Sequence, residues 1–195
     1  MFLLILPDVA TDDSLLALLR RGERDAVIAA YEAYFAPLYQ YTRLKVGDAA
    51  LAEDIVSDVF VALLQSLGKA SAPHSNLRAW LFRVARNQIA QHYDKVKQFT
   101  ETELEEWMPA PVSDNPAAGL DDLFEIERVR HALRMLNADH QEILIIRFGQ
   151  RLSLQEAADI MGRSVGAIKQ LQFRALETLR SILIDPQAQM EGSDG

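Results

Sequence analysis

Basic, amide and aromatic side chains share one face of the helix that the sequence predicts for residues 165–184. This face, with the serine at the start of the helix, comprises Ser164, Lys169, Gln170, Phe173 and Arg174. Lys and Arg can neutralise phosphates, and together with Gln they can hydrogen-bond base edges in a major groove. Glu177 lies among them and would repel a phosphate. The pattern nevertheless favours contact with duplex DNA over a plain solvated face.

The segment before this helix has the spacing of a helix-turn-helix. Residues 153–156 read Ser-Leu-Gln-Glu, a capping box that starts a helix over 153–161. Ala158 is small enough to let two helices touch, Gly162 can take a left-handed turn, and Ile168 can fill the angle between the helices. The alternative is an ordinary helical hairpin.

A second candidate surface lies on the helix predicted for residues 49–67, which Asp48 can cap. Its buried stripe is aliphatic, and the opposite side carries Asp54, Ser57, Asp58, Val61, Leu64 and Gln65. Carboxylates interleaved with exposed aliphatic residues favour a protein partner. The alternative is a solvated face with two scattered apolar residues.

A third candidate surface lies on the helix predicted for residues 76–98. Arg83, Arg86 and Asn87 project from one side, with Phe82 and Tyr93 at its border. Cations and an amide beside aromatic rings suit single-stranded DNA, whose unstacked bases can stack on such rings. Trp80 is expected in the core.

The charge pattern divides the chain into parts. The net charge is −8, yet residues 98–122 hold seven acids and no Lys or Arg, so this segment supplies almost all of the excess. Its prolines and lost periodicity are typical of a linker.

The sequence predicts an all-α fold, with helical domains over residues 10–97 and 121–184, an acidic flexible linker over 98–120, and disordered tails over 1–9 and 185–195. The expected helices of the first domain end near Arg20, Val46, Leu67 and Gln98, with Pro37 marking a kink or restart. In the second domain they cover 122–136, 138–149, 153–161 and 165–184.

Other chemistry is disfavoured. The 195 residues include no cysteine, which excludes disulfides and thiolate sites. The four histidines are scattered without metal-ligand spacing, and no nucleotide-binding or nucleophile motif occurs. The apolar start is too short to span a bilayer. We expect no metal, no cofactor, no enzyme activity and no membrane insertion.

Three stretches together resemble one family, the extracytoplasmic-function (ECF) sigma factors. Residues 52–60 resemble the family's polymerase-binding helix, residues 76–87 its promoter-melting segment, and residues 136–175 its upstream-element reader. The resemblance implies that Asp54, Ser57, Asp58, Val61 and Gln65 meet the coiled coil of the polymerase β′ subunit. It also implies that Ser75, Asn76, Arg83, Arg86, Asn87 and Gln91 bind and melt the downstream (−10) element, while the helix-turn-helix reads the upstream (−35) element. Asn137 stands where the family usually has proline.

The resemblance further implies partners and a compartment: bacterial RNA polymerase core through its β′ and β subunits, promoter DNA, an anti-sigma factor, and the cytoplasm. Two other classes stay open, a stand-alone helix-turn-helix regulator and a structural helical adaptor. The acidic linker has two interpretations as well: a solvated spacer, or an anionic segment that occupies the RNA path of the polymerase.

Overall fold

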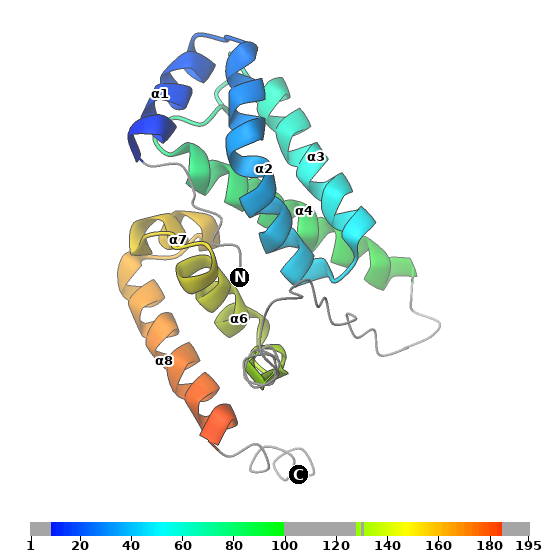
Figure 1. Ribbon diagram of the computed structural model, residues 1–195, viewed down its shortest axis with the longest axis vertical. Coiled ribbons are helices and arrows are strands. Elements are labelled where there is room, and N and C mark those ends of the chain that lie inside the picture. Colours follow the sequence, from blue (N-terminus) through cyan, green and yellow to red (C-terminus); the bar gives the residue numbers. More distant parts are fainter. Residues whose placement is uncertain (1–8, 100–127, 130, 185–195) are drawn as a thin grey trace, which may run out of the picture. The chain divides into compact units, whose positions relative to one another are not determined.

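The computed structural model describes residues 9–99, 128–129 and 131–184, and every regular element in these ranges is helical (Figure 1). The chain divides into two compact units, one containing α1 to α4 and the other containing α6, η1, the first part of α7 and α8. The predicted all-α fold is confirmed. The predicted tails lie outside the described residues apart from Val9, and so does the acidic linker apart from residues 98 and 99.

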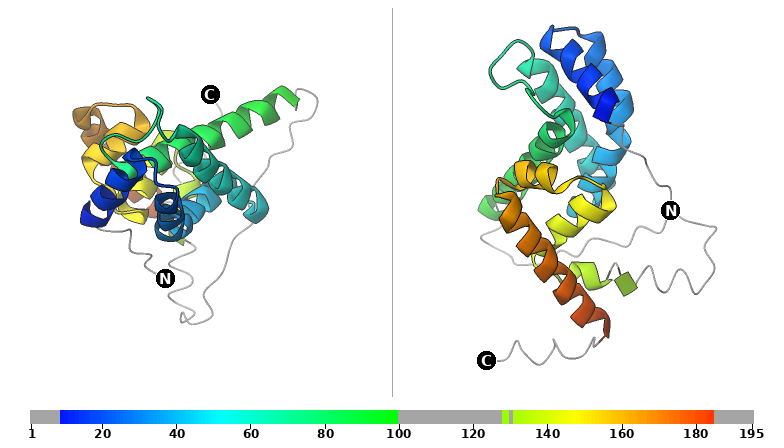
Figure 2. Two further views of the ribbon diagram at one scale, coloured as in Figure 1. Left: turned by 90° about the horizontal axis from the view of Figure 1, so that it is seen from above. Right: turned by 90° about the vertical axis from the view of Figure 1, so that its left-hand side faces the viewer.

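The first domain consists of α1 (Val9–Arg20), α2 (Asp25–Val46), α3 (Ala49–Ser66) and α4 (Leu77–Phe99). Figure 2 shows α2 and α3 side by side with α4 crossing them, and all three pack on one another. Local chemistry sets the boundaries. Gly47 ends α2 with φ +74°, and the Asp48 carboxylate caps α3 by accepting a 2.7 Å bond from the Leu51 amide.

Pro37 does not divide α2, because a single helix covers Asp25–Val46, so the predicted restart at this residue is wrong. A proline inside a helix removes one backbone hydrogen bond. Pro37 is itself buried, and its neighbours Tyr34 and Leu38 are fully buried in the core. Tertiary packing on this turn therefore outweighs the lost bond.

The core of the first domain combines aliphatic and aromatic side chains with one buried carboxylate. Tyr41 and Phe82 are fully buried and meet edge to face, with ring centroids 5.3 Å apart. The Asp12 side chain is 4% exposed and accepts bonds from the Tyr34 hydroxyl at 2.5 Å and the Leu77 amide at 3.1 Å. One side chain of α1 thus satisfies a polar group on α2 and an unpaired amide at the start of α4.

The second domain consists of α6 (Ala138–Leu144), a π-helical turn η1 (Ile145–Gly149), α7 (Leu154–Met161) and α8 (Val165–Ile184). α6 packs against α8. The segment predicted as one helix over 138–149 changes to π geometry at Ile145, and the predicted helices over 153–161 and 165–184 are confirmed within a residue. Of the helix predicted over 122–136, residues 128–129 and 131–134 are described as helical.

Asn137 caps α6 by accepting a 2.9 Å bond from the His140 amide. The residue that departs from the family's usual proline therefore stabilises a helix start by another route, since asparagine is among the best capping residues.

Candidate nucleic-acid and partner-protein interfaces

The turn between α7 and α8 has the predicted helix-turn-helix geometry. Gly162 adopts φ +65°, and the Arg163 amide donates to the Ala158 carbonyl at 3.0 Å, a bond typical of a glycine-terminated helix end. Ala158 is 3% exposed and Ile168 is fully buried. The three residues singled out in the sequence therefore have the conformation and burial that the motif requires.

Capping bonds fix both helices of the motif. The Ser153 amide donates to the Glu156 carboxylate at 2.7 Å and the Glu156 amide donates to the Ser153 hydroxyl at 3.1 Å, which completes the predicted capping box. Ser164 caps α8 by accepting a 3.2 Å bond from the Ala167 amide. Its hydroxyl thus has a structural role beside the predicted DNA contact.

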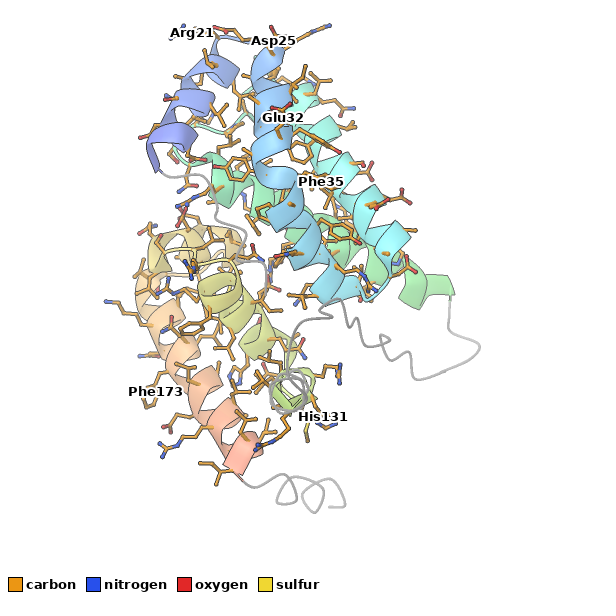
Figure 3. All side chains as sticks on the ribbon, viewed as in Figure 1. Arg21, Asp25, Glu32, Phe35, His131 and Phe173 are labelled. Carbon is orange, nitrogen blue, oxygen red and sulfur yellow. The ribbon has the colours of Figure 1, made fainter. Side chains whose placement is uncertain are left out.

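The outer face of α8 is solvent-exposed at every predicted position. Lys169, Gln170 and Arg174 are exposed. Phe173 is 63% exposed and projects away from α6 (Figure 3). A large aromatic ring left in water beside two cations and an amide is a feature of a binding surface. Glu177 is exposed as well.

Arg147 belongs to the stretch that resembles the family's upstream-element reader, and in the structure it holds α8 in position. From η1 its guanidinium donates to the Gln172 side chain at 2.9 Å and to the Leu152 carbonyl. It therefore joins α8 to the segment that precedes α7. An arginine in an amphipathic helix is ordinarily a surface residue, so only the three-dimensional arrangement reveals this link.

The predicted protein-binding face of α3 is exposed along its length. Asp54, Ser57, Asp58 and Gln65 are exposed, and Val61 and Leu64 keep 49% and 46% of their surface in solvent. Among the residues that the structure describes, neither carboxylate forms an ion pair. The face therefore offers unpaired negative charge beside apolar surface.

An aromatic row on α2, which was not among the predicted binding residues, borders this face. The Tyr31 ring lies 4.9 Å from the ring of Phe60 on α3 and 5.0 Å from Phe35, which in turn stacks on Tyr39 at 6.1 Å. Phe35 points from α2 toward α3 (Figure 3). Tyr31, Phe35 and Tyr39 are spaced four residues apart, which indicates that they share one face of a helix. Such a face usually belongs to the core, so the spacing alone does not indicate a binding surface.

On its other side α3 meets α4 across a shallow hollow of about 130 Å³. Asp54, Asp58, Gln88, Gln91 and His92 supply its polar lining. One edge of the hollow thus belongs to the α3 face and the other to the polar side of α4.

The surface of α4 that was predicted to bind single-stranded DNA is exposed at some of the predicted residues and buried at others. Arg83, Asn87 and Gln91 are exposed and Arg86 is half-buried. Phe82, expected at the border of this face, is fully buried against Tyr41. Its position on the helix turns it toward α2, so it cannot stack on a base.

Tyr93 is half-buried and donates to the Lys45 carbonyl at 2.9 Å. Burial raises the pKa of its hydroxyl. Tyr93 was expected at the border of the cationic face. Its hydroxyl instead forms a structural bond between α4 and the end of α2.

Trp80, which was predicted to be a core residue, holds the loop before α4. Trp80 is 8% exposed, and its indole donates to the Ser71 carbonyl at 3.0 Å. Ser75 is exposed, whereas Asn76 is half-buried and caps α4 by accepting a 2.7 Å bond from the Ala79 amide. The Ser75 side chain is therefore accessible, and the Asn76 amide oxygen already has a structural partner.

Metal-binding groups and membrane-spanning helices are both absent from the described residues. No group of three His, Cys, Asp or Glu side chains there could hold a metal ion. No described helix is long and apolar enough to cross a membrane.

Comparison with known proteins agrees with both domains. Residues 30–98 match the model of sigma-70 region 2, and residues 132–181 match that of sigma-70 region 4. The chain is 35% identical over 165 residues to the ECF RNA polymerase sigma factor BldN of Streptomyces coelicolor, covering 84% of this chain and 62% of that protein. It is 30% identical over 154 residues to the RNA polymerase sigma factor YlaC of Bacillus subtilis, covering 78% and 88%.

A solved structure shares the fold. In a co-crystal structure of the sigma factor RpoE with the anti-sigma factor NepR from Bartonella quintana, a chain 25% identical to this one superposes with a TM-score of 0.66, covering 80% of this chain and 94% of that one. The matches to both sigma-70 regions and the shared fold define a transcription initiation factor. The chain belongs to the ECF type of RNA polymerase sigma factors.

Proposed function

We propose that this sigma factor divides its work among three exposed faces. The face of α3 docks on polymerase core, the polar side of α4 engages the melted downstream promoter element, and the outer face of α8 reads the upstream element. One observation carries the proposal: α3 presents unpaired carboxylates beside exposed aliphatic side chains. A stand-alone DNA-binding regulator has no need of such a face in addition to a helix-turn-helix.

The docking face extends beyond α3 onto α2. Tyr31 contacts Phe60, so the aromatic row continues the apolar part of the α3 surface. Interfaces place aromatic residues at a desolvated centre and charges at the rim. In this arrangement Asp54 and Asp58 meet basic residues of the β′ coiled coil, and Leu64, Tyr31 and Phe35 supply apolar contact.

The two DNA faces suit different forms of DNA. On α8, Lys169, Gln170 and Arg174 are exposed on a helix that the Ser164 cap and Arg147 hold in place, as readout of a rigid groove requires. On α4, Arg83, Asn87 and Gln91 form an open cationic and amide surface that suits an anionic single strand.

The same faces are candidates for a regulator. The similar RpoE chain was solved with an anti-sigma factor, and an exposed docking face is what such a partner would cover. We also propose that the protein has no catalytic activity of its own and acts in the cytoplasm, where bacterial RNA polymerase transcribes.

Paired rescue experiments test the division of work. Arg174→Ala should reduce transcription from duplex promoters by about tenfold, the cost of one good base contact, and an artificial upstream activator should restore it. Asn87→Ala should instead be rescued by a template with a pre-melted bubble. Rescue in the opposite pattern would show that the roles of the two domains are reversed.

A further inference from the structure

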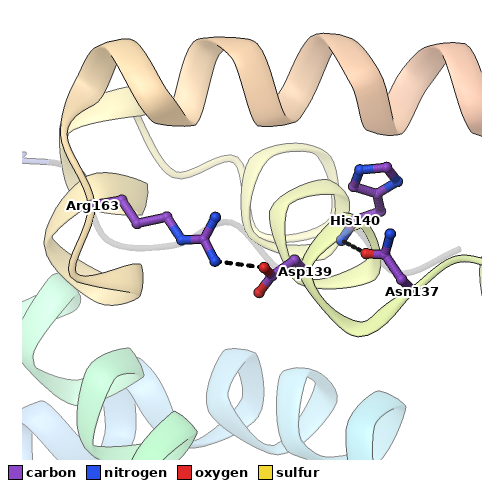
Figure 4. A network of polar contacts seen from close by, with 4 residues as sticks. All are labelled: Asn137, Asp139, His140 and Arg163. Atoms are coloured by element: carbon purple, nitrogen blue, oxygen red, sulfur yellow. Dashed lines mark hydrogen bonds and ion pairs between the residues drawn. The ribbon is translucent and has the colours of Figure 1, made fainter.

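An ion pair links the turn of the helix-turn-helix to the start of α6. Arg163, between α7 and α8, places its guanidinium 2.5 Å from the Asp139 carboxylate (Figure 4). The two side chains keep 39% and 44% of their surface exposed. This is therefore a solvent-accessible contact, and such pairs contribute little to stability because water and salt screen them.

Arg163 lies where a DNA backbone would pass. It directly precedes Ser164, the cap of α8, and the proposed base-reading residues begin at Lys169 on the same helix. When the N-terminal part of a recognition helix enters a major groove, the residues just before it face the phosphates that border the groove. A guanidinium there can form a bidentate bond to a phosphate.

We propose that Arg163 is a further DNA-backbone contact and that Asp139 competes with the phosphate for it, so that this carboxylate limits DNA affinity. The proposal rests on α8 being the upstream reader. In the free protein the guanidinium is paired within the chain, and DNA must displace Asp139 before it gains the contact. Because the pair is exposed, its release costs at most about fivefold in the equilibrium constant.

The competing explanation is that the pair only braces the turn. Other bonds already hold this turn and the start of α6: the Arg163 amide donates to Ala158, and Asn137 caps α6. The guanidinium is therefore free to exchange partners while the backbone stays in place.

A double-mutant cycle separates the two explanations. Asp139→Asn, Arg163→Gln and the double variant of the full chain are titrated by fluorescence anisotropy with a 30-base-pair duplex of arbitrary sequence, at several salt concentrations. A phosphate contact does not depend on sequence, so no promoter is needed. Asp139→Asn should bind up to about fivefold tighter than the parent, and the slope of log K against log salt should steepen by up to about 0.9, the value for one phosphate. The gain should disappear in the Arg163→Gln background.

Two results would overturn the proposal. An equal gain in both backgrounds would mean that Asp139 acts only as a general negative charge. Weaker binding by Asp139→Asn together with a lower thermal midpoint would mean that the pair is a brace. The proposed function is tested by a different measurement, promoter binding by the holoenzyme. The double-mutant cycle uses non-specific duplex without polymerase, so the two proposals can fail independently.

Discussion

The two domains differ in how their candidate binding residues relate to the bonds that hold the fold. In the first, large side chains from all four helices are fully buried, and the candidate binding residues Asp54, Asp58 and Asn87 are exposed with no structural role of their own. In the second, polar bonds carry much of the architecture: the Ser153–Glu156 capping box, the Ser164 cap and Arg147. Asp54, Asp58 and Asn87 can therefore be changed without unfolding the first domain, whereas in the second domain structural and DNA-facing side chains are neighbours.

The largest effect should come from the docking face. Reversing both charges, as Asp54→Lys with Asp58→Lys, should weaken core binding by about 100-fold or more, because each new cation would face a basic partner. Both positions are exposed, so helicity and the thermal midpoint should stay at the parental values. Asp13→Lys with Asp25→Lys, at exposed positions on α1 and α2, is the matched control. Equal core affinity of the two double variants would remove the case for an α3 docking face.

Asp12 tests how far a single polar group supports the first domain. Asp12→Ala removes the acceptor that the Tyr34 hydroxyl and the Leu77 amide share, which should lower the free energy of unfolding by about 3 kcal/mol. Tyr34→Phe removes only one of the bonds and should cost about 1 kcal/mol. Urea unfolding measures both. Similar, small losses would indicate that hydrophobic packing alone holds α1.

Arg147 is the corresponding link in the second domain. Arg147→Met keeps the aliphatic stem and removes the bonds to Gln172 and Leu152, so we expect a loss of about 2 kcal/mol. Upstream-element binding should fall with it, because α8 loses its tie to the segment before α7. Arg151→Met, at an exposed position in the same segment, serves as control. Full DNA affinity in Arg147→Met would contradict the positioning role.

The Gly162 turn should show a smaller effect. No atom would obstruct an added Cβ at Gly162, so Gly162→Ala should cost only the left-handed conformation, about 1 kcal/mol. Gly162→Asn should cost less, since asparagine tolerates that conformation. Thermal unfolding would confirm this if the midpoint is highest for the parent, lower for Gly162→Asn and lowest for Gly162→Ala. A loss as large for Asn as for Ala would instead point to a packing requirement.

The smallest effect concerns pH. The folded protein raises the pKa of Tyr93 above its ordinary value of 10.0 because the hydroxyl is buried. The folded state therefore favours the neutral hydroxyl, and this contribution is complete below pH 10 and lost as pH rises through the folded-state pKa. The stability advantage of the parent over Tyr93→Phe should narrow above pH 10. An advantage that does not change with pH would show that the hydroxyl does not titrate in this range.

Sequence patterns anticipated local features and missed non-local ones. The capping box, Gly162 and the Asp48 cap involve residues within a few positions of one another, so their signatures are legible in the chain. The Asp12 and Arg147 links join residues 65 and 25 positions apart, and no local pattern encodes such pairs. Phe82 was misplaced for a related reason, because α4 is apolar on more than one side and only its contact with Tyr41 decides which side is core.

Recognition of promoters as a subunit of RNA polymerase is what separates a sigma factor from a stand-alone DNA-binding regulator. A promoter can be selected from a random duplex library with reconstituted holoenzyme, and its affinity for the chain then measured with and without core. Because the first domain is close to neutral and the chain carries a net charge of −8, the chain alone has little cationic surface for counterion release. We predict weak binding by the free chain and tight, salt-sensitive binding with core. Equal affinity in the two conditions would contradict the account and identify a stand-alone regulator.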